Sequence, residues 1–320
     1  MNACLIMGHK NPTQIIRLAK RLLEEEDNEV FIHLDSFMTE EETNLVEDFC
    51  LDNKSAHYCY DRIHGVLDKR SLVDIVFKMI SKSKLIEENE NKQYDYYLLF
   101  SGQDYPIKSI NLINDELRKN YPKPYIDCTP YDKGNWIYHK FYYCRKALRF
   151  HDWITMNFRK GPLRSTLRAF AIIWTKMLSY IGADSYHKLK KEGVKIYGGS
   201  AWWILPDIII DSIYNSYKNE DKVSELILNE SVTPEETYFQ IMSMRSPFSY
   251  MLEINQPDMV LQNCMTWAYF FDEEKIFKGH PYIFTMKEFD KLKTSNCWFA
   301  RKFDINVDAK ILDALDYMNQ

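Results

Sequence analysis

Apolar and polar positions form alternating blocks along the first third of the chain, and these blocks predict strands and helices in turn. Short apolar runs of strand length occupy residues 3–8, 29–35 and 94–100. Between them, residues 12–23 and 71–86 repeat apolar side chains at helical spacing, and the first of these helices opens with a proline. Strands that alternate with helices favour a Rossmann-like α/β fold, with a mixed, mostly parallel sheet and helices on both faces.

Polar residues follow each of the three predicted strands. His9 lies just after the first strand, His33 and Asp35 end the second, and the sequence SGQD at residues 101–104 follows the third. The carboxyl ends of parallel strands meet at one edge of a sheet, where ligands bind. Ordinary turns use the same residue types, so a single cluster would be explained by a turn. Three clusters at one edge favour a binding site.

Two adjacent tryptophans mark a predicted strand in the second half of the chain. The sequence YGGSAWWILP, residues 197–206, is typical of a strand entered through two glycines and a serine. Side chains alternate along a strand, so Trp202 and Trp203 must point to opposite faces. One of them can pack in the core. The other either covers a second layer or stacks on a ligand such as a sugar ring.

A pair of glutamates follows in the sequence Thr233-Pro234-Glu235-Glu236. This sequence has the form of a capping box, in which Thr233 caps a helix and Glu236 reaches back to the cap. A carboxylate in a first helical turn is also a plausible general base. Glu235 and Glu236 point in different directions, so one can cap while the other faces a cleft.

A basic pair near the C-terminus, Arg301 and Lys302, sits between aromatic residues in the sequence CWFARKFD. Solvated basic side chains are the ordinary explanation. If the pair is buried beside the rings, it can instead hold a phosphate.

The net charge and the absence of several motifs argue against some classes of protein. The net charge is −5, which argues against a general nucleic-acid binder. The chain has no G-x-G-x-x-G after the first strand and no GK[ST], so dehydrogenases and P-loop proteins are disfavoured. It contains no D-x-D sequence, a metal-binding motif of many transferases. The seven cysteines are scattered without metal-ligand spacing, which predicts reduced thiols in a cytosolic protein.

No signal peptide and no membrane-spanning run is predicted, but residues 163–182 form a basic amphipathic segment. Leucine, phenylalanine, tryptophan and methionine recur there at helical spacing, with arginine and lysine between them. Such a helix can lie on an anionic membrane. A helix packed on the core, with its basic residues in solvent, fits the pattern equally well.

Several motifs, taken in order, carry a resemblance to a known family. They are ACLIMGHKNPTQIIRLAKRLL, VFIHLD, YLLFSGQDYPIKS, GGSAWWIL, TPEETYFQ and WFARKFD. The chain resembles the core-2/I-branching β-1,6-N-acetylglucosaminyltransferases, whose family includes the peptide O-xylosyltransferases, and it looks like a bacterial-type member. The resemblance runs through nearly the whole chain and is weakest at residues 132–189. It implies a GT-A-like fold and inverting transfer from a UDP-sugar without a metal.

The resemblance also implies roles for residues that match the family motifs. Glu236 corresponds to the general base and Lys302 to the lysine on the donor diphosphate. The family has a second diphosphate-binding arginine upstream, and no arginine occupies that place here; Lys278 and His280 are the nearest candidates. The other donor-binding candidates are His9 and Asp35 at the uridine edge, Asp104, which would orient the donor sugar or its own loop, and Arg301. The acceptor-binding candidates are Trp202, Trp203, Trp267 and Glu235.

Taken together, the sequence predicts one glycosyltransferase domain over residues 1–320. It would contain a nucleotide-binding half (1–130), a divergent helical segment facing the acceptor or a membrane (131–190), and a catalytic and acceptor half (191–320). We expect a UDP-sugar donor, with UDP-N-acetylglucosamine favoured, and a saccharide acceptor that is free or lipid-linked. We expect no metal cofactor and no nucleic-acid partner, and a cytoplasmic location, free or peripheral at the inner membrane surface. A UDP-xylose-dependent xylosyltransferase, a non-catalytic carbohydrate-binding protein and a membrane-associated scaffold remain open alternatives.

Overall fold

The computed structural model describes most of the 320-residue chain. The described residues are 1–67, 69–131, 150, 153–154, 161–231, 233–255, 263–268, 271–272, 275–276 and 281–319.

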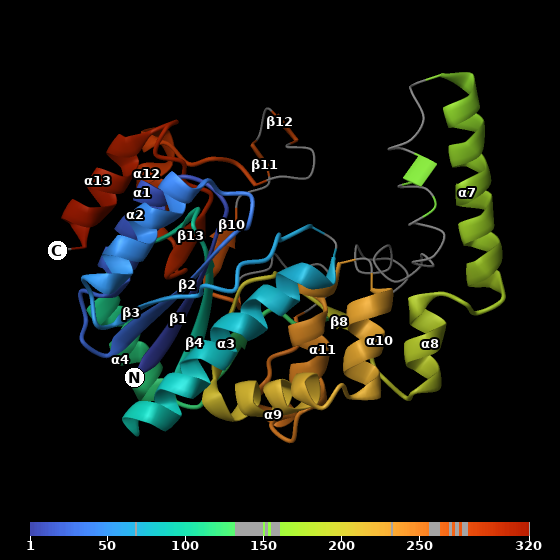
Figure 1. The fold of residues 1–320 in the computed structure, drawn as a ribbon, viewed down its shortest axis with the longest axis horizontal. Coiled ribbons are helices and arrows are strands. Elements are labelled where there is room, and N and C mark those ends of the chain that lie inside the picture. The colour runs from blue at the N-terminus through green and yellow to red at the C-terminus, as the bar shows by residue number, and fades with distance from the viewer. Residues whose placement is uncertain are drawn as a thin grey trace.

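A six-stranded sheet with the strand order β3-β2-β1-β4-β9-β6 forms the centre of the molecule (Figure 1). Strands β1, β2, β3 and β4 run parallel to one another, whereas β9 runs antiparallel to its neighbours β4 and β6. The prediction of a mixed, mostly parallel sheet is therefore confirmed. The strands are β1 (Asn2–Gly8), β2 (Asn28–Leu34), β3 (Ala56–Tyr58), β4 (Tyr96–Ser101), β6 (Tyr125–Ile126) and β9 (Trp203–Pro206).

Helices cover both faces of this sheet, as predicted. Successive side chains of β1 point to opposite faces, so Ile6 packs in one apolar core and Leu5 in the other. The core around Ile6 is closed by α1 (Pro12–Leu22), α2 (Glu40–Leu51), α4 (Ile110–Asn120) and α13 (Ala309–Met318). The core around Leu5 is closed by α3 (Arg70–Glu90), α9 (Asp207–Lys218), α10 (Lys222–Glu230) and α11 (Tyr238–Arg245).

The predicted elements of the first third lie close to the observed ones, but helix α2 was not predicted. Its start is specified by a capping box, in which the Glu42 amide donates to the Thr39 hydroxyl and the Thr39 amide donates to the Glu42 carboxylate. Val46 and Phe49 then bury one side of the helix against the sheet. The Thr-x-x-Glu spacing was a signal that could have identified it.

A second, three-stranded sheet joins segments that are far apart in the sequence. Strand β13 (Phe299–Arg301) lies between β10 (Thr266–Ala268) and β5 (Asp104–Pro106). In this sheet Arg301 pairs with Asp104, and Ala300 pairs with Trp267 on the other side. The predicted SGQD loop and the predicted basic pair are therefore neighbours.

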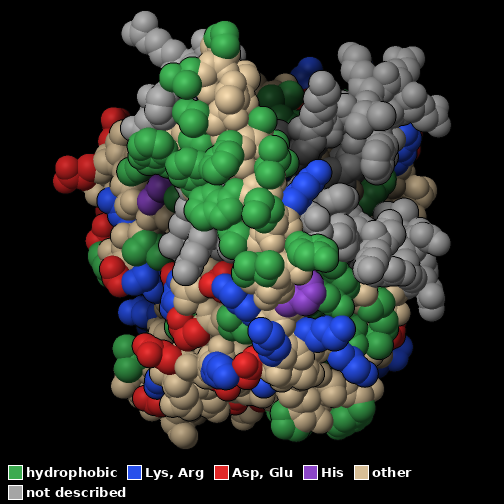
Figure 2. Space-filling model, turned by 90° about the vertical axis from the view of Figure 1, so that its right-hand side faces the viewer, with side chains coloured by type: hydrophobic (Ala, Val, Ile, Leu, Met, Phe, Trp, Pro, Cys, Tyr) green, Lys and Arg blue, Asp and Glu red, His purple; other side chains and the backbone are tan. Residues whose placement is uncertain are grey.

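Two helices extend from one end of the molecule, α7 (Pro162–Tyr180) and α8 (Ser185–Lys191), and Figure 2 looks onto this end. No helix in the described parts of the chain is long and apolar enough to span a membrane. The remaining elements are short: β7 (Thr129–Pro130), β8 (Tyr197–Gly198), β11 (Phe271–Asp272), β12 (Lys275–Ile276), α12 (Phe289–Thr294) and the 3-10 turns η1 (Pro234–Glu236), η2 (Ser249–Met251) and η3 (Met286–Glu288).

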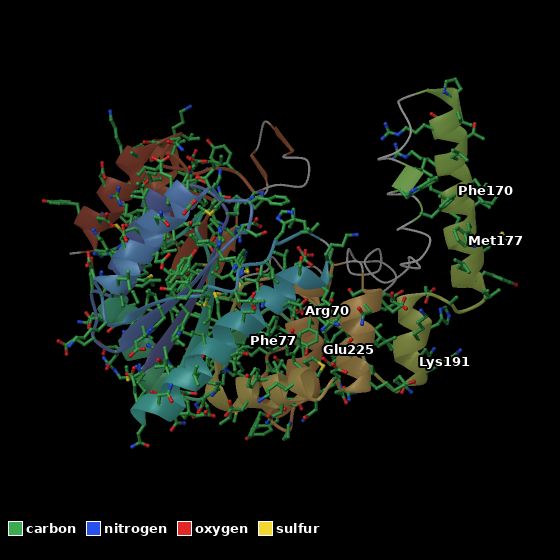
Figure 3. All side chains as sticks on the ribbon, viewed as in Figure 1. Arg70, Phe77, Phe170, Met177, Lys191 and Glu225 are labelled. Carbon is green, nitrogen blue, oxygen red and sulfur yellow. The ribbon has the colours of Figure 1, made fainter. Side chains whose placement is uncertain are left out.

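Side chains of α3 contact the neighbouring helices α9 and α10 (Figure 3). The Arg70 guanidinium lies 2.8 Å from the Glu225 carboxylate of α10. The Phe77 ring stacks on Tyr217 of α9 with centroids 3.8 Å apart. These contacts hold α9 and α10, which precede the η1 turn in the chain, against α3.

The described cysteines are buried and form no disulfide with one another, which confirms free thiols at those positions. Burial raises the pKa of the Cys50 and Cys59 thiols to about 12, so both stay protonated at neutral pH. Cys144 lies outside the described residues.

Candidate active site

The three polar clusters predicted at the sheet edge lie side by side. The Asp35 amide, just after β2, donates to the Gly8 carbonyl at 2.7 Å, and the Gly102 amide, just after β4, donates to the Met7 carbonyl at 2.9 Å. Strand β1 therefore holds the ends of β2 and β4 on its two sides. The predicted common edge is confirmed.

Asp35 is held as a carboxylate at this edge. It accepts hydrogen bonds from the Phe37 and Gly65 amides, each at 2.9 Å, and its Oδ2 lies 2.9 Å from His64 Nδ1. Burial raises the pKa of Asp35, but the hydrogen bonds from Phe37, His64 and Gly65 outweigh burial, so the pKa lies below its usual value. Asp35 is 7% exposed, so a ligand here would meet a charged carboxylate that offers only a small accessible surface.

The sequence did not identify His64 and Phe37, which complete the surroundings of Asp35. The two rings stack with centroids 3.9 Å apart, and the Phe37 side chain is 78% exposed. The exposed ring offers a flat apolar surface beside a carboxylate. A residue 29 positions away in the sequence supplies the histidine, so no local pattern points to it.

The two predicted histidines differ in their surroundings. His33 is buried and accepts a hydrogen bond from the Ile63 amide at 3.1 Å, and burial lowers its pKa to about 4. His9 is exposed at the edge. Its pKa is lowered by desolvation and by the charges of Lys10 and Lys302, while Asp35 opposes them. Lys302 and Asp35 therefore act in opposite directions on the pKa of His9.

Asp104 is buried completely, which corrects the expectation that it touches a donor directly. Its carboxylate accepts hydrogen bonds from the Ser101 amide at 2.6 Å and the Ser101 hydroxyl at 3.1 Å. It also lies 3.6 Å from Arg301 Nη1. Burial raises the pKa of Asp104 above its usual value. Asp104 therefore fixes its own loop and faces Arg301, the second of the two roles considered for it.

The solvated-pair explanation is wrong for Arg301, which is buried, whereas Lys302 is partly exposed. Arg301 is 8% exposed, and its guanidinium carbon lies 4.0 Å from the centroid of the Trp202 ring. Lys302 is half-buried, and its backbone bonds to Tyr282 and Phe284. Desolvation and then the Arg301 charge lower the pKa of Lys302. An anion in contact with Lys302 would favour its charged form.

Trp202 lies just before β9 and is partly buried against the core around Leu5, the same core that contains Trp203. Trp203 is 1% exposed in the core and its ring lies 4.7 Å from the Phe239 ring, so no sugar can stack on it. Its assignment to the acceptor site is therefore corrected. Trp202 lies against Arg301 and is partly exposed, so it remains a candidate.

The capping box predicted at Thr233 does not form. Residues Pro234–Glu236 make a short 3-10 turn, and the Thr233 side chain makes no capping bond. Instead, the amide of Glu236 and the hydroxyl of Thr237 both donate to the Thr233 carbonyl, at 3.1 and 3.0 Å. A turn of three residues is closed by the 3-10 bond itself, so it needs no reciprocal side-chain cap. Glu235 and Glu236 are both partly buried.

The backbone connects Glu236 to the tryptophan segment. The Gly199 amide donates to the Glu236 carbonyl at 2.9 Å, and Gln240 of α11 donates to the Ser200 carbonyl at 2.7 Å. Two residues further on, Trp202 contacts Arg301. A continuous set of contacts therefore leads from the glutamate turn to the basic pair.

Gly199 allows this connection because no side chain fits there. A Cβ atom at residue 199 would lie 1.9 Å from the Asp127 carbonyl oxygen. We expect Gly199→Ala to lower the free energy of unfolding by about 1–3 kcal/mol, the usual cost of overpacking. Gly161→Ala is the matched control, since nothing lies within 4 Å of a Cβ there. Urea unfolding of both variants tests the close approach, and equal stability would contradict it.

Three predicted site residues remain: Trp267, Lys278 and His280. Trp267 of β10 is partly exposed, with its ring 5.4 Å from the Phe284 ring. Lys278 and His280 lie outside the described residues, so the second diphosphate contact stays a prediction. Within the described ranges, no three His, Cys, Asp or Glu side chains gather as a metal site would require. Metal independence also stays a prediction.

Two surface hollows lie away from these residues. One is beside α1, lined by residues that include Arg17 and Tyr105, and the other is near the N-terminus, beside Asp27 and Asp95. Neither is lined by any predicted site residue. The edge of the central sheet therefore remains the candidate site on chemical grounds.

No family model matches the chain. It is 22% identical, over 98% of its length, to the beta-glucuronosyltransferase GlcAT14B of Arabidopsis thaliana, and it spans 65% of that protein. Among solved structures, mouse xyloside xylosyltransferase 1 in its apo form has a TM-score of 0.37 at 9% identity, covering 94% of this chain and 97% of its own. The mannosyltransferase Ktr4p of S. cerevisiae in complex with GDP has a TM-score of 0.31 at 11% identity, covering 74% and 66%. The chain is thus similar to a glycosyltransferase along nearly all its length, while membership of the core-2/I-branching family stays a prediction.

Proposed function

We propose that this protein is an inverting, UDP-sugar-dependent glycosyltransferase. The observation that carries the proposal is the grouping of ionisable residues at the carboxyl edge of the central sheet. There Asp35 is held ionised, the chain beside Lys302 is joined to the SGQD loop by the hydrogen bond from the Phe303 amide to the Gln103 carbonyl, and contacts through Trp202 lead toward Glu236. The likeness to a glucuronosyltransferase over nearly the whole chain supports the same class.

In the proposed mechanism the uridine lies near His9 and Asp35, and the diphosphate lies against Lys302. The exposed face of Phe37 is available to the uracil ring. Glu236 takes the proton from an acceptor hydroxyl while the hydroxyl oxygen forms a bond to the anomeric carbon. The bond from that carbon to the UDP oxygen breaks on the opposite side, so an α-linked donor gives a β-linked product.

The leaving UDP gains negative charge during this step, and cations must stabilise it. We propose Lys302 for this role, because Arg301 is only 8% exposed and its guanidinium lies against the Trp202 ring and 3.6 Å from the Asp104 carboxylate. We therefore propose Arg301 as a positioning residue, which holds the Trp202 ring and the SGQD loop. Transfer would then need no metal on the diphosphate.

UDP-N-acetylglucosamine is the proposed donor, on the resemblance of the motifs to the branching enzymes. The Arabidopsis relative is a beta-glucuronosyltransferase by name, so UDP-glucuronate is a second donor to consider. UDP-xylose is the third. The acceptor is proposed to be a saccharide, near Trp202 and Trp267.

Hydrolysis of a panel of UDP-sugars tests the proposal and the metal question together. We expect release of UDP from UDP-N-acetylglucosamine faster than from UDP-xylose or UDP-glucuronate, at a rate unchanged by EDTA. If another UDP-sugar is cleaved faster, only the proposed identity of the donor is wrong. Loss of activity with EDTA would overturn metal independence. If no UDP-sugar is cleaved and none raises the melting temperature, a non-catalytic carbohydrate-binding protein becomes the better account.

A further inference from the structure

Helix α7 exposes an apolar face that the proposed catalytic role does not use. The face consists of Leu163, Phe170, Trp174, Met177 and Ile181, the last just beyond the helix. At 100° per residue these five positions fall within about 60° of one another around the helix axis. Phe170 is 58% exposed and Met177 is 63% exposed. A contiguous exposed patch of large apolar side chains marks a binding surface in most soluble proteins.

The figures show where this face points. Helix α7 stands at one end of the molecule, and Phe170 and Met177 lie on it (Figure 3). Seen from that end, apolar side chains form a column that faces the viewer, with lysine and arginine side chains gathered below it (Figure 2). The apolar face and a basic region therefore share one side of the molecule.

The net charge of α7 and α8 is opposite in sign to that of the whole chain. Residues 162–191, which span α7 and α8, contain six basic residues and one acidic residue, while the chain as a whole has a net charge of −5. The single acid, Asp184, is 1% exposed and caps α8 through His187. Lys190 and Lys191 of α8 are exposed, and Lys191 is marked in Figure 3.

The basic residues of α7 stand beside the apolar face. Arg164 and Lys176 fall about 120° to either side of its centre at 100° per residue. From there, long basic side chains can reach an anionic headgroup while the apolar face enters the lipid boundary. The charged residues of α7 are all basic, and exposed apolar residues also occur beside and opposite this face at Ile173 and Ile172. This combination of apolar and positive side chains fits a lipid surface with negative headgroups.

We propose that the apolar face of α7 and the lysines of α8 form a surface that binds anionic lipid bilayers. Helix α7 is about 28 Å long and would lie flat in the headgroup region. A second copy of the chain is a weaker occupant, because a symmetric dimer would bring two surfaces of net positive charge together. The proposal stands apart from the proposed catalytic function, since it uses none of the site residues.

Vesicle flotation of the full chain tests the surface. We expect the protein to float with vesicles of phosphatidylcholine and phosphatidylglycerol, to stay behind with phosphatidylcholine alone, and to be released by high salt. The double variant Phe170→Ser with Met177→Ser should bind at least about tenfold more weakly. Leu51→Ser with Tyr317→Ser is the matched control, because these exposed apolar residues lie on α2 and α13.

A charge variant keeps the test informative if the apolar variant folds poorly. Lys190→Gln with Lys191→Gln should weaken binding by about fivefold per lysine. Lys20→Gln with Lys119→Gln removes the same charge from exposed positions on α1 and α4 and should leave binding unchanged. UDP-induced thermal stabilisation, measured on each variant, reports on the proposed catalytic function separately.

Three results would overturn the proposal. One is the absence of flotation with anionic vesicles. Another is equal binding by the surface variants and their matched controls. A third is a doubled mass in light scattering that the Phe170→Ser, Met177→Ser variant abolishes, because the apolar face would then join two copies of the chain.

Discussion

Glu236→Gln is expected to lower the rate of sugar transfer by about 10²- to 10⁴-fold, the usual contribution of a general base. Glutamine has the same shape but cannot accept the proton of the acceptor hydroxyl. The hydrogen bond from the Gly199 amide to residue 236 uses the backbone carbonyl, so the substitution leaves it in place. The dissociation constant for UDP should stay the same. Turnover of the preferred UDP-sugar and calorimetric titration with UDP measure the two quantities.

Glu235→Gln is the matched control, since Glu235 lies in the same 3-10 turn with similar burial. As a candidate acceptor contact, Glu235 is expected to affect the KM for the acceptor more than the rate at saturation. If the Glu236→Gln variant turns over like the unmodified protein, Glu236 has only a structural role in its turn.

Lys302→Ala is expected to weaken UDP binding by about 10- to 150-fold, which corresponds to about 1.5–3 kcal/mol for a hydrogen bond to a charged group. The alanine variant removes the cation that we place on the diphosphate. The rate of sugar transfer should fall further than binding does, because negative charge on the diphosphate grows as the bond breaks. Calorimetry with UDP and with uridine separates the diphosphate from the nucleoside.

Uridine should bind the Lys302→Ala variant as it binds the unmodified protein, since its contacts are proposed to lie at Asp35 and His9. Lys310→Ala removes the same charge from an exposed position on α13 and serves as the control. An unchanged UDP dissociation constant in the Lys302→Ala variant would remove this lysine from the site.

The sequence predicted the central sheet because its signals are local. The strands beginning at Asn2, Asn28 and Tyr96 are short and apolar, and the chain between them shows helical spacing. Parallel pairing then fixes where their polar ends lie, so the common edge of His9, Asp35 and the SGQD loop followed from the pattern. Helix α2 was missed although its capping box is equally local.

The second sheet could not be predicted, because each of its strands has only three residues of regular pairing and they come from distant parts of the chain. From the sequence alone, solvent exposure was the ordinary explanation for Arg301. Asp104 was expected to orient a donor sugar or its own loop. The pairing of these two residues buries both. The stacking of Phe37 on His64 was hidden for the same reason, since a loop after β3 brings His64 back to the edge.

Two further corrections concern the tryptophan pair and the capping box at Thr233. A pair of adjacent tryptophans shows only that one is inside, and packing against α11 decides that it is Trp203. At Thr233 the sequence has the form of a capping box, but the following turn closes after three residues and leaves the reciprocal cap unformed. Tertiary packing therefore decides the first case, and the local geometry of a short turn decides the second.

The central claim is that the carboxyl edge of β1, β2 and β4 holds a nucleoside diphosphate between Asp35 and Lys302. A crystal structure of the protein with UDP tests it most directly. We predict the uridine beside Asp35 and a phosphate oxygen within hydrogen-bonding distance, about 3 Å, of Lys302 Nζ. UDP bound at another place, with both side chains free of it, would contradict the account.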